Sequence, residues 1–272
     1  MNELNRIVAY QVPIFDRGLF RLRRRIKQSN VLAISDLARA IETGIATILY
    51  HRIQLEKYIR GRPIYALSLD PLPIEVSAPE VVKLAALAAQ AAQVGPMAAI
   101  PGALAELAVR DMMSEGASVS LIENGGEIAA TSTQPLIVGV YAGASPVSGK
   151  IGFHLALEDF PIGIATSSAT VSHALNFGEA DAAVVVADTA SLADAAAKAV
   201  CNSVAGEDIE ASVKSGLAKA ESIRGVRGAL VIRRDYVGTA GRLPRLIKLN
   251  CTREELFGAS LQELPPQGIA QL

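Results

Sequence analysis

Residues 180–200 read ADAAVVVADTASLADAAAKAV, and this stretch sets the character of the whole chain. Its continuous apolar run, Ala182–Ala187, predicts a strand that is covered on both faces. Asp188 and Thr189 then supply side chains that can cap a helix, which the alanines carry to about Val200. A buried strand is therefore expected to lead directly into a helix of small side chains.

Two further small-residue helices are predicted upstream. The first begins at a capping box, Ser77-Ala78-Pro79-Glu80, and runs to about Gln93. The second spans about residues 97–114 and ends before Gly116, a typical helix C-terminal glycine. Both segments are so rich in alanine and glycine that we expect another element to approach them closely.

The turn between these two helices is a candidate ligand contact. It reads VGPMAA over residues 94–99 and places Gly95 where the backbone N–H groups of a helix start can meet an anion. An ordinary helix–helix turn is the alternative interpretation.

Strands and turns dominate the remaining sequence. Asn124-Gly125-Gly126 separates the strand-like runs Val119–Ile122 and Glu127–Ala129, and Asn-Gly in that place predicts a β-hairpin. Its tip offers backbone and amide donors from Asn124, Gly125 and Gly126 to a ligand, with a plain turn as the alternative. Further strands are predicted at residues 136–141, 151–157, 161–165 and 228–232.

Short strands and helices alternate without a steady βαβ rhythm. This arrangement favours an α+β fold, with mixed or antiparallel sheets and alanine-rich helices packed on them.

The composition argues against nucleic acids and membranes as partners. The 272 residues carry 26 basic and 27 acidic side chains, a net charge of −1, and no tryptophan. Such a chain lacks the basic field and the aromatic platform that nucleic-acid binding uses. Lys83 and Gln90 interrupt the one long apolar segment, residues 81–109, so no membrane span is predicted. Two cysteines and an N-terminus without an apolar leader predict a cytoplasmic protein.

A dense hydroxyl cluster follows the strand predicted at residues 161–165. Residues 165–173 read ATSSATVSH, with five hydroxyls and one histidine. Ser167, Ser168 and Thr170 are expected to hold polar ligand atoms, and His173 to transfer a proton or supply a hydrogen bond. A Ser/Thr-rich loop with a structurally satisfied histidine is the alternative.

Asp194 stands out because it is a carboxylate among alanines, near the middle of its predicted helix. A charge in such surroundings is rarely buried unless it is paired or bound to a metal. Lys198 lies four residues further on, on the same helical face, so an ordinary Asp–Lys pair is the alternative. We expect Asp194 and Lys198 together to anchor charge at a binding site.

The order of these motifs resembles an uncharacterised ApbE-related family. The resemblance covers about residues 6–234 and rests on Val94–Ala99, Glu123–Gly126, Thr166–Ser168, Ser172-His173 and residues 180–195. It implies one ApbE-like α+β domain over residues 1–234, followed by a C-terminal extension over residues 235–272.

The wider superfamily contains FAD:protein FMN transferases, which bind FAD, hold magnesium and move FMN onto a threonine of a partner protein. Their Ser-Gly motif near the flavin is similar to Ser167-Ser168 here, and their Ser-His pair is similar to Ser172-His173. The resemblance implies FAD or a related flavin as cofactor, His173 and Asp194 as catalytic residues, and Asp194 as a metal ligand. The threonine that helps to hold magnesium in the transferases falls on Lys198, a cation, which argues against magnesium here.

Our leading prediction is a cytosolic ApbE-like protein that binds a phosphate-bearing flavin- or pterin-like small molecule. In this interpretation the Lys198 ammonium replaces the metal and contacts a phosphate as a point charge. One alternative is a magnesium-dependent FAD:protein FMN transferase. Another is a non-enzymatic assembly protein, whose small-residue helices pack in an oligomer such as a homodimer. No nucleic-acid or membrane partner is expected.

Overall fold

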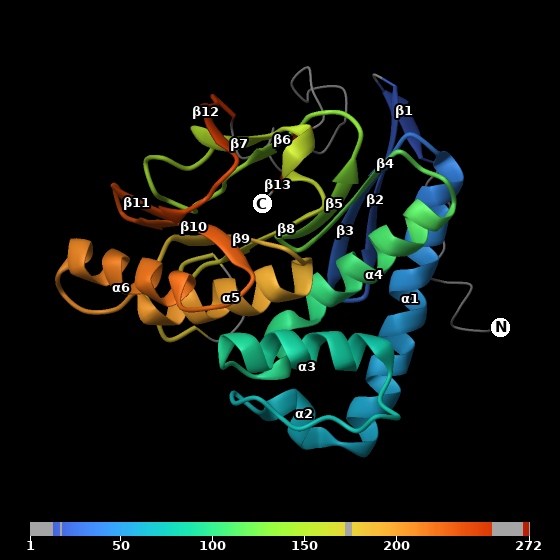
Figure 1. Cartoon of the computed structure of the whole chain (residues 1–272), viewed down its shortest axis with the longest axis horizontal. Helices are drawn as coiled ribbons and strands as arrows, with labels where there is room; N and C mark the ends of the chain where they lie inside the picture. Colours follow the sequence, from blue (N-terminus) through green and yellow to red (C-terminus); the bar gives the residue numbers. More distant parts are fainter. Residues whose placement is uncertain (1–12, 17, 172–175, 252–268, 272) are drawn as a thin grey trace.

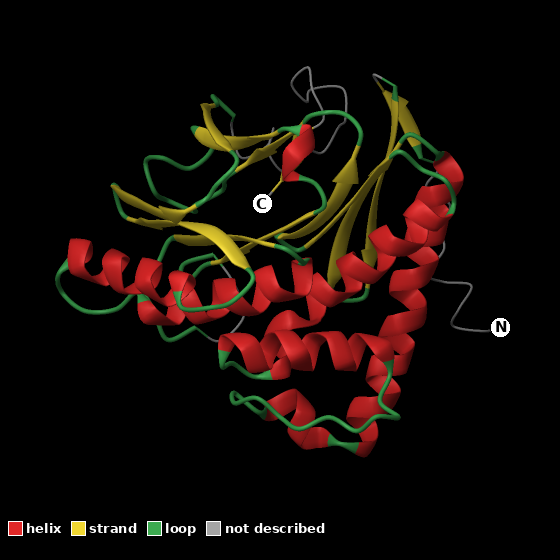
Figure 2. Cartoon of the chain, in the orientation of Figure 1, coloured by secondary structure: helices red, strands yellow, loops and turns green. Residues whose placement is uncertain are grey.

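The computed structural model describes residues 13–16, 18–171, 176–251 and 269–271. Helices cover one face of a large twisted sheet, and a smaller sheet lies over the other face (Figure 1; Figure 2). The predicted α+β class, with antiparallel sheets and alanine-rich helices packed on them, is confirmed.

Within the described residues, the large sheet has nine strands in the order β1-β2-β3-β4-β5-β8-β9-β10-β11, each antiparallel to its neighbours. The small sheet has the order β12-β7-β6-β13, and β13 runs parallel to β6. The strands of the large sheet are β1 Ile14–Asp16, β2 Leu19–Ile26, β3 Ser29–Ser35, β4 Val119–Asn124, β5 Glu127–Ser132, β8 Ile162–Ser167, β9 Ala182–Ala187, β10 Val226–Arg233 and β11 Tyr236–Gly241. Those of the small sheet are β6 Leu136–Gly139, β7 Ile151–Leu155, β12 Arg245–Lys248 and β13 Ile269–Gln271.

The helices lie together beneath the large sheet (Figure 1). They are α1 Ala38–Gly61, α2 Pro63–Leu67, α3 Glu80–Ala92, α4 Ile100–Ser114, α5 Ala190–Ser203 and α6 Ile209–Glu221, with the 3₁₀ turn η2 Pro96–Ala99. A second 3₁₀ turn, η3 Leu157–Asp159, lies on the other side of the large sheet, near the small sheet (Figure 1). Among the described residues, no single helix has both the length and the apolar content to cross a membrane. Residues 80–92 and 96–114 reach that length only as a pair, and the pair is bent by 106°.

The apolar core has two layers, one on each face of the large sheet. Alternate residues of β9 show the division. Ala183, Val185 and Ala187 pack on the helical side, and Val184 and Val186 pack toward the small sheet. A strand buried on both faces needs apolar residues at every position, which is why Ala182–Ala187 forms a continuous apolar run. The prediction for this strand is confirmed.

Small residues let α5 lie directly on its neighbours. A side-chain carbon on Gly163 of β8 would stand 2.3 Å from the backbone carbonyl of Thr189, and one on Gly102 of α4 would stand 2.3 Å from the carbonyl oxygen of Ala190. Thr189 caps α5, since its side chain accepts a hydrogen bond from the Leu192 N–H. The predicted close approach of another element is confirmed for α4, and that element is the start of α5.

The predicted hairpin is formed by β4 and β5. Its strands pair from Val119 opposite Ser132 to Glu123 opposite Ile128. Gly125 and Gly126 at the tip have φ values of +80° and +115°, which other residues rarely adopt.

One predicted detail, the capping box at the start of α3, is wrong. Pro79 occupies the N-cap position, and no side chain caps the helix. The Ser77 hydroxyl instead donates to Glu75, and the Glu80 carboxylate pairs with Arg110 of α4. The Glu80 carboxylate, which a capping box would use, is instead occupied by this ion pair between α3 and α4.

Residues after 234 take part in both sheets. β11 pairs with β10 from Arg233 opposite Tyr236 to Gly228 opposite Gly241. β12 pairs with β7, where Arg245 lies opposite His154. Part of the segment predicted as a C-terminal extension therefore continues the sheets of the preceding domain.

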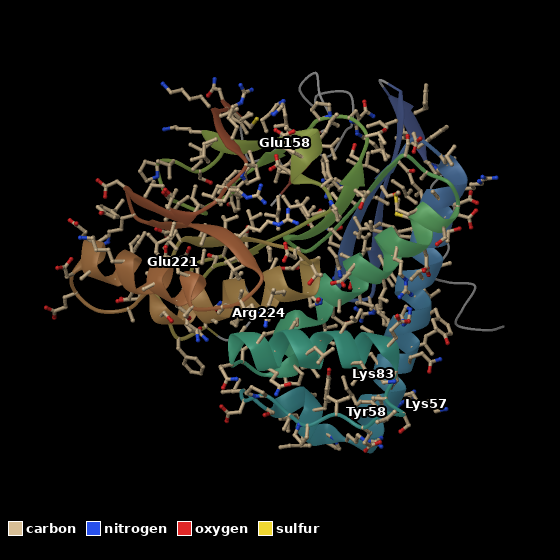
Figure 3. The ribbon with its side chains drawn as sticks, viewed as in Figure 1. Lys57, Tyr58, Lys83, Glu158, Glu221 and Arg224 are labelled. Carbon is tan, nitrogen blue, oxygen red and sulfur yellow. The ribbon has the colours of Figure 1, made fainter. Side chains whose placement is uncertain are left out.

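α2 is held against the end of α1 by an aromatic contact. The rings of Tyr58 on α1 and Tyr65 on α2 meet edge to face, with centroids 5.4 Å apart; Figure 3 labels Tyr58 beside Lys57. The Arg62 guanidinium lies 4.5 Å from the centre of the Tyr58 ring. These contacts fix the start of the connector that leads to α3.

Candidate functional site

Strand pairing brings the hairpin tip beside the hydroxyl cluster. Glu127, the first residue of β5, lies opposite Ala165 of β8. Ser167, the last residue of β8, and Ser168, which follows it, therefore lie beside the turn that joins β4 to β5. A side-chain carbon on Gly126 would lie 3.7 Å from the carbonyl oxygen of Thr166. Two motifs that are separated by some forty positions in the sequence thus lie at the same end of the sheet.

Asp194 enters this region from α5 and is buried. Its carboxylate accepts a hydrogen bond from the Gly102 N–H in the first turn of α4, with 2.9 Å between nitrogen and Oδ2. Helix N-terminal N–H groups stabilise a negative charge. Burial nevertheless raises the pKa of Asp194 to about 8, although the Gly102 bond and the Lys198 charge act to lower it. Asp194 is thus a carboxyl that holds its proton near neutral pH.

Lys198 lies one turn after Asp194 and reaches the hydroxyl cluster. Its ammonium donates to Asn176 Oδ1 at 2.8 Å, and the Ser167 hydroxyl donates to the same oxygen at 3.3 Å. Asn176 Nδ2 in turn donates to the Ser168 carbonyl at 2.7 Å. Burial lowers the pKa of Lys198, while the charges around it act to raise that pKa. The structure therefore brings Lys198, Ser167 and Ser168 together through an asparagine that sequence reasoning did not select.

The Ser168 hydroxyl is engaged within its own turn. It accepts hydrogen bonds from the N–H groups of Thr170 and Val171, at 3.1 and 3.0 Å. The exposed Thr170 hydroxyl donates to Asp181 Oδ1 at 3.2 Å. His173 and Ser172, with the catalytic role predicted for His173, lie outside the described residues.

Glu127 is a site residue that sequence reasoning passed over. Only 8% of its surface is exposed, although it sits at the start of a strand next to a turn. Burial raises the pKa of Glu127 well above its usual range, and the nearby carboxyls of Asp194 and Glu123 raise it further. A glutamate at a hairpin tip is ordinarily solvated, so no local signal distinguished this one.

Asn124 and Glu123 hold the hairpin in place. Asn124 Nδ2 donates to the Pro101 carbonyl at 3.1 Å, which joins the hairpin to the start of α4. Glu123 Oε1 accepts from the Gly126 N–H at 2.9 Å, and the Arg23 guanidinium lies 3.9 Å from Glu123 Oε2. Burial raises the pKa of Glu123 to about 7. One amide hydrogen of Asn124 is therefore occupied by the fold, whereas its predicted contact with a ligand stays a prediction.

Gly95 lies where α3 and η2 meet the segment that follows α2. A side-chain carbon there would stand 2.0 Å from the carbonyl oxygen of Ser68. This close backbone approach explains the glycine without a ligand, and the predicted ligand contact stays a prediction.

The residues around Asp194 do not fit a magnesium ion. Within the described residues, no group of three histidine, cysteine, aspartate or glutamate side chains is placed to hold a metal. Among the described residues, the Lys198 ammonium is a cation whose charge acts to lower the pKa of Asp194. The Lys198 ammonium donates to Asn176 Oδ1 at 2.8 Å.

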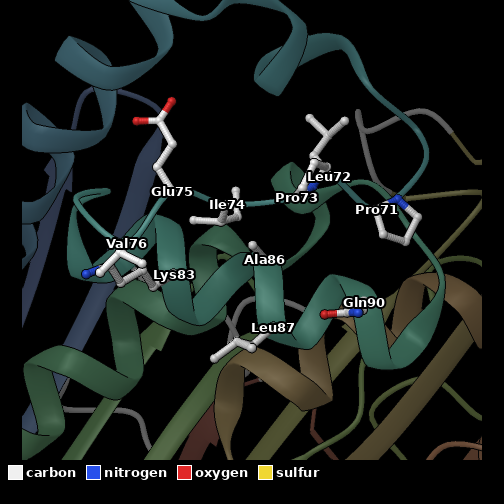
Figure 4. Close-up of a pocket in the computed structure, with 10 residues that line it drawn as sticks. All are labelled: Pro71, Leu72, Pro73, Ile74, Glu75, Val76, Lys83, Ala86, Leu87 and Gln90. Atoms are coloured by element: carbon white, nitrogen blue, oxygen red, sulfur yellow. The ribbon is translucent and has the colours of Figure 1, made fainter.

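An open groove lies elsewhere on the molecule, between the proline-rich connector and α3 (Figure 4). It has a volume of about 650 Å³ and is lined mainly by apolar side chains. Val76 and Leu87 on its rim are 91% and 65% exposed. None of the candidate site residues around Asp194 and Lys198 lines this groove.

The family model described as AbpE bacteria matches residues 16–226. The chain belongs to this family. Relatives named UPF0280 protein resemble it over most of their length. One from Methanocaldococcus jannaschii is 39% identical over 242 residues, which cover 88% of this chain and 98% of the relative. One from Methanococcus vannielii is also 39% identical over 242 residues, covering 88% and 97%.

Solved ApbE structures share the fold of this AbpE-family chain. The apo form of flavinyl transferase ApbE from Pseudomonas stutzeri has a TM-score of 0.53 at 15% identity, covering 82% of this chain and 94% of that one. The ApbE protein of Thermotoga maritima has a TM-score of 0.54 at 12% identity, covering 82% and 97%. Such a likeness concerns the fold, and the predicted ApbE-like fold is confirmed.

Proposed function

We propose that this protein binds a phosphate-bearing flavin- or pterin-like small molecule beside α5, in the cytoplasm. The observation that carries the proposal is the position of the half-buried Lys198 ammonium, which is held by Asn176 next to Ser167. A cation beside hydroxyl and amide groups suits a phosphate, because charge-assisted hydrogen bonds to phosphate oxygens are among the stronger ones. The flavinyl transferase named among the structural neighbours supports a flavin as one form of this ligand.

In this proposal each residue contacts a different part of the ligand. Lys198 contacts a phosphate as a point charge, the role that the resemblance gives to magnesium in the transferases. Ser167, Ser168 and the backbone of Gly125–Gly126 hold polar atoms of the ligand. Asp194 keeps a proton near neutral pH, and His173 supplies a hydrogen bond or a proton.

The first test is calorimetric titration of the purified chain with FAD, FMN and neopterin monophosphate, with and without magnesium. We expect one of these ligands to bind equally well in both conditions. Replacing Lys198→Met should weaken its binding about 10- to 100-fold, because a hydrogen bond to a charged group contributes about 1.5–3 kcal/mol.

Lys214→Met is the matched control, because Lys214 lies on the surface of α6 and pairs with Glu210 of the same helix at 2.6 Å. Its affinity should equal that of the wild type. Absence of binding to all three ligands, or equal affinities of the Lys198 and Lys214 variants, contradicts the proposal.

FMN transfer is a second candidate function, favoured by the fold shared with a flavinyl transferase. It would move the FMN moiety of FAD onto a threonine hydroxyl and release AMP. Incubation with FAD, magnesium and a threonine-bearing acceptor tests it by mass spectrometry. An acceptor of unchanged mass excludes this activity.

A further inference from the structure

The groove between α3 and the connector, residues 71–76, has the dimensions of a small-molecule site (Figure 4). Its volume of about 650 Å³ lies within the range of about 300–1,000 Å³ that is usual for ligand pockets. The residues that line it from α3 are Lys83, Ala86, Leu87 and Gln90. Their i, i+3, i+4, i+7 spacing puts them on one helical face, over a length of about 10 Å. The groove is therefore elongated, with an apolar middle and a polar side chain at each end.

The connector forms a wall of this groove that the rest of the fold anchors. Its two prolines restrict the backbone, and Leu72 and Ile74 pack against the core on the helical side of the large sheet. The Arg62 guanidinium binds both oxygens of the Glu75 carboxylate, at 2.8 and 2.7 Å, which ties the far end of the connector to the start of α2. A wall that is already fixed need not be ordered by its ligand, so binding costs less conformational entropy.

One end of the groove carries a positive charge. The half-buried Lys83 makes no ion pair or hydrogen bond with another described residue, although its charge acts on Glu80. Arginines hold the two neighbouring carboxylates, since Arg62 binds Glu75 and Arg110 binds Glu80. Figure 4 shows the Glu75 carboxylate directed away from α3. A ligand with one negative charge at this end would therefore complement the groove, through a charge-assisted hydrogen bond.

We infer that this groove binds an aliphatic carboxylate, a single apolar chain that ends in one carboxylate group. The Lys83 ammonium donates to the carboxylate, and the chain lies along Ala86 and Leu87 toward Gln90. A carboxylate suits one ammonium because it carries a single charge, whereas a phosphate monoester carries nearly two at pH 7. None of the lining residues belongs to the site proposed beside α5, so this is a second, separate binding activity.

The first measurement is calorimetric titration of the wild-type chain with hexanoate, octanoate, decanoate and dodecanoate, each below its micelle concentration. Each added methylene should strengthen binding about two- to fourfold, because it is buried against apolar side chains. The gain should stop once the chain extends past Gln90, where the groove ends. Absence of binding by every carboxylate, or equal affinities across the series, overturns the proposal.

Lys83→Met tests the contact with the carboxylate. It should weaken decanoate binding about tenfold and leave the affinity for the neutral decan-1-ol unchanged, because only the charged contact is lost. Lys57→Met is the matched control, since Lys57 is exposed on α1 and does not line the groove (Figure 3). A thermal melt checks each fold, and Lys83→Gln gives a second variant without the charge. Decanoate affinities of the Lys83 variants equal to that of Lys57→Met contradict the proposal.

Leu87→Gln tests the apolar surface of the groove. Leu87 is 65% exposed, and its loss should weaken decanoate and decan-1-ol alike, by about fivefold or more. Leu157→Gln, at a residue of η3 that is 54% exposed and lies outside the groove, should change neither affinity. Light scattering on the wild type and Leu87→Gln tests the other occupant, a second copy of the chain. A dimer that Leu87→Gln dissociates, together with no carboxylate binding, would assign the groove to that second copy and overturn the proposal.

Discussion

A single hydrogen bond, from the Gly102 N–H to Asp194, joins the start of α4 to the middle of α5. Gly102 has no room for a side chain there, because a carbon at that position would lie 2.8 Å from Asp194 Cβ. The alanines that surround Asp194 bring its helix close enough for this contact, and they also remove water from the carboxyl. The same packing therefore creates the bond and raises the pKa.

Asp194 should make stability depend on pH. Its ordinary pKa is 3.8 and its folded pKa about 8, so between these values the folded chain retains a proton that the unfolded chain releases. Stability from this group is therefore lost as pH rises from about 4 to about 8. Asp194→Asn stays uncharged and should raise the free energy of unfolding at pH 8 by at least about 1 kcal/mol.

Chemical denaturation of both proteins at pH 5 and pH 8 measures this effect. The gain should be smaller at pH 5, where the wild-type carboxyl is already protonated. An equal change at the two pH values would show that Asp194 is ionised in the folded chain at both.

At the scale of elements, the backbone of β8 at Gly163 packs directly against the backbone at the start of α5. Gly163→Ala would place a methyl 2.3 Å from the carbonyl of Thr189, at the N-cap of α5. Overpacking of this kind costs about 1–3 kcal/mol, and here the opposing atoms are backbone and cannot rotate away. We expect a loss of that size in the free energy of unfolding, together with weaker ligand binding as α5 shifts.

Gly61→Ala provides the control for that substitution. Gly61 ends α1, and a carbon added there meets nothing within 4 Å. Alanine favours a helix over glycine by up to about 1 kcal/mol, so this variant should be neutral or slightly more stable. A Gly163→Ala protein as stable as Gly61→Ala would mean that β8 and α5 can move apart freely.

At the scale of the whole molecule, the strands after residue 234 close the edges of both sheets. β11 covers the edge of β10, and β12 covers that of β7. A chain that ends at Arg234 should expose the edge of β10, which is a template for aggregation. We expect it to be less stable and to form higher oligomers in size-exclusion chromatography with light scattering. A chain that ends at Cys251 keeps β11 and β12 and serves as the comparison; if both behave alike, β11 and β12 contribute little.

Much of the architecture could be read from local sequence. The continuous run Ala182–Ala187 requires burial on both faces, and the paired glycines 125 and 126 permit the positive φ of a tight hairpin. Asp194 could be selected in the same way, because a charge among alanines is visible within one helical turn. Each of these signals depends only on the residues near it in the chain.

Tertiary structure alone decided the rest of the candidate site. Glu127 became a buried acid because β5 pairs with β8 on one side while α5 packs beneath it, and Asn176 reached Lys198 across a span that no motif marks. Glu80 likewise pairs with Arg110 of α4 and does not form the predicted capping box. The physical reason is that backbone preferences are local, whereas the desolvation and partnering of a charged side chain are set by segments distant in sequence.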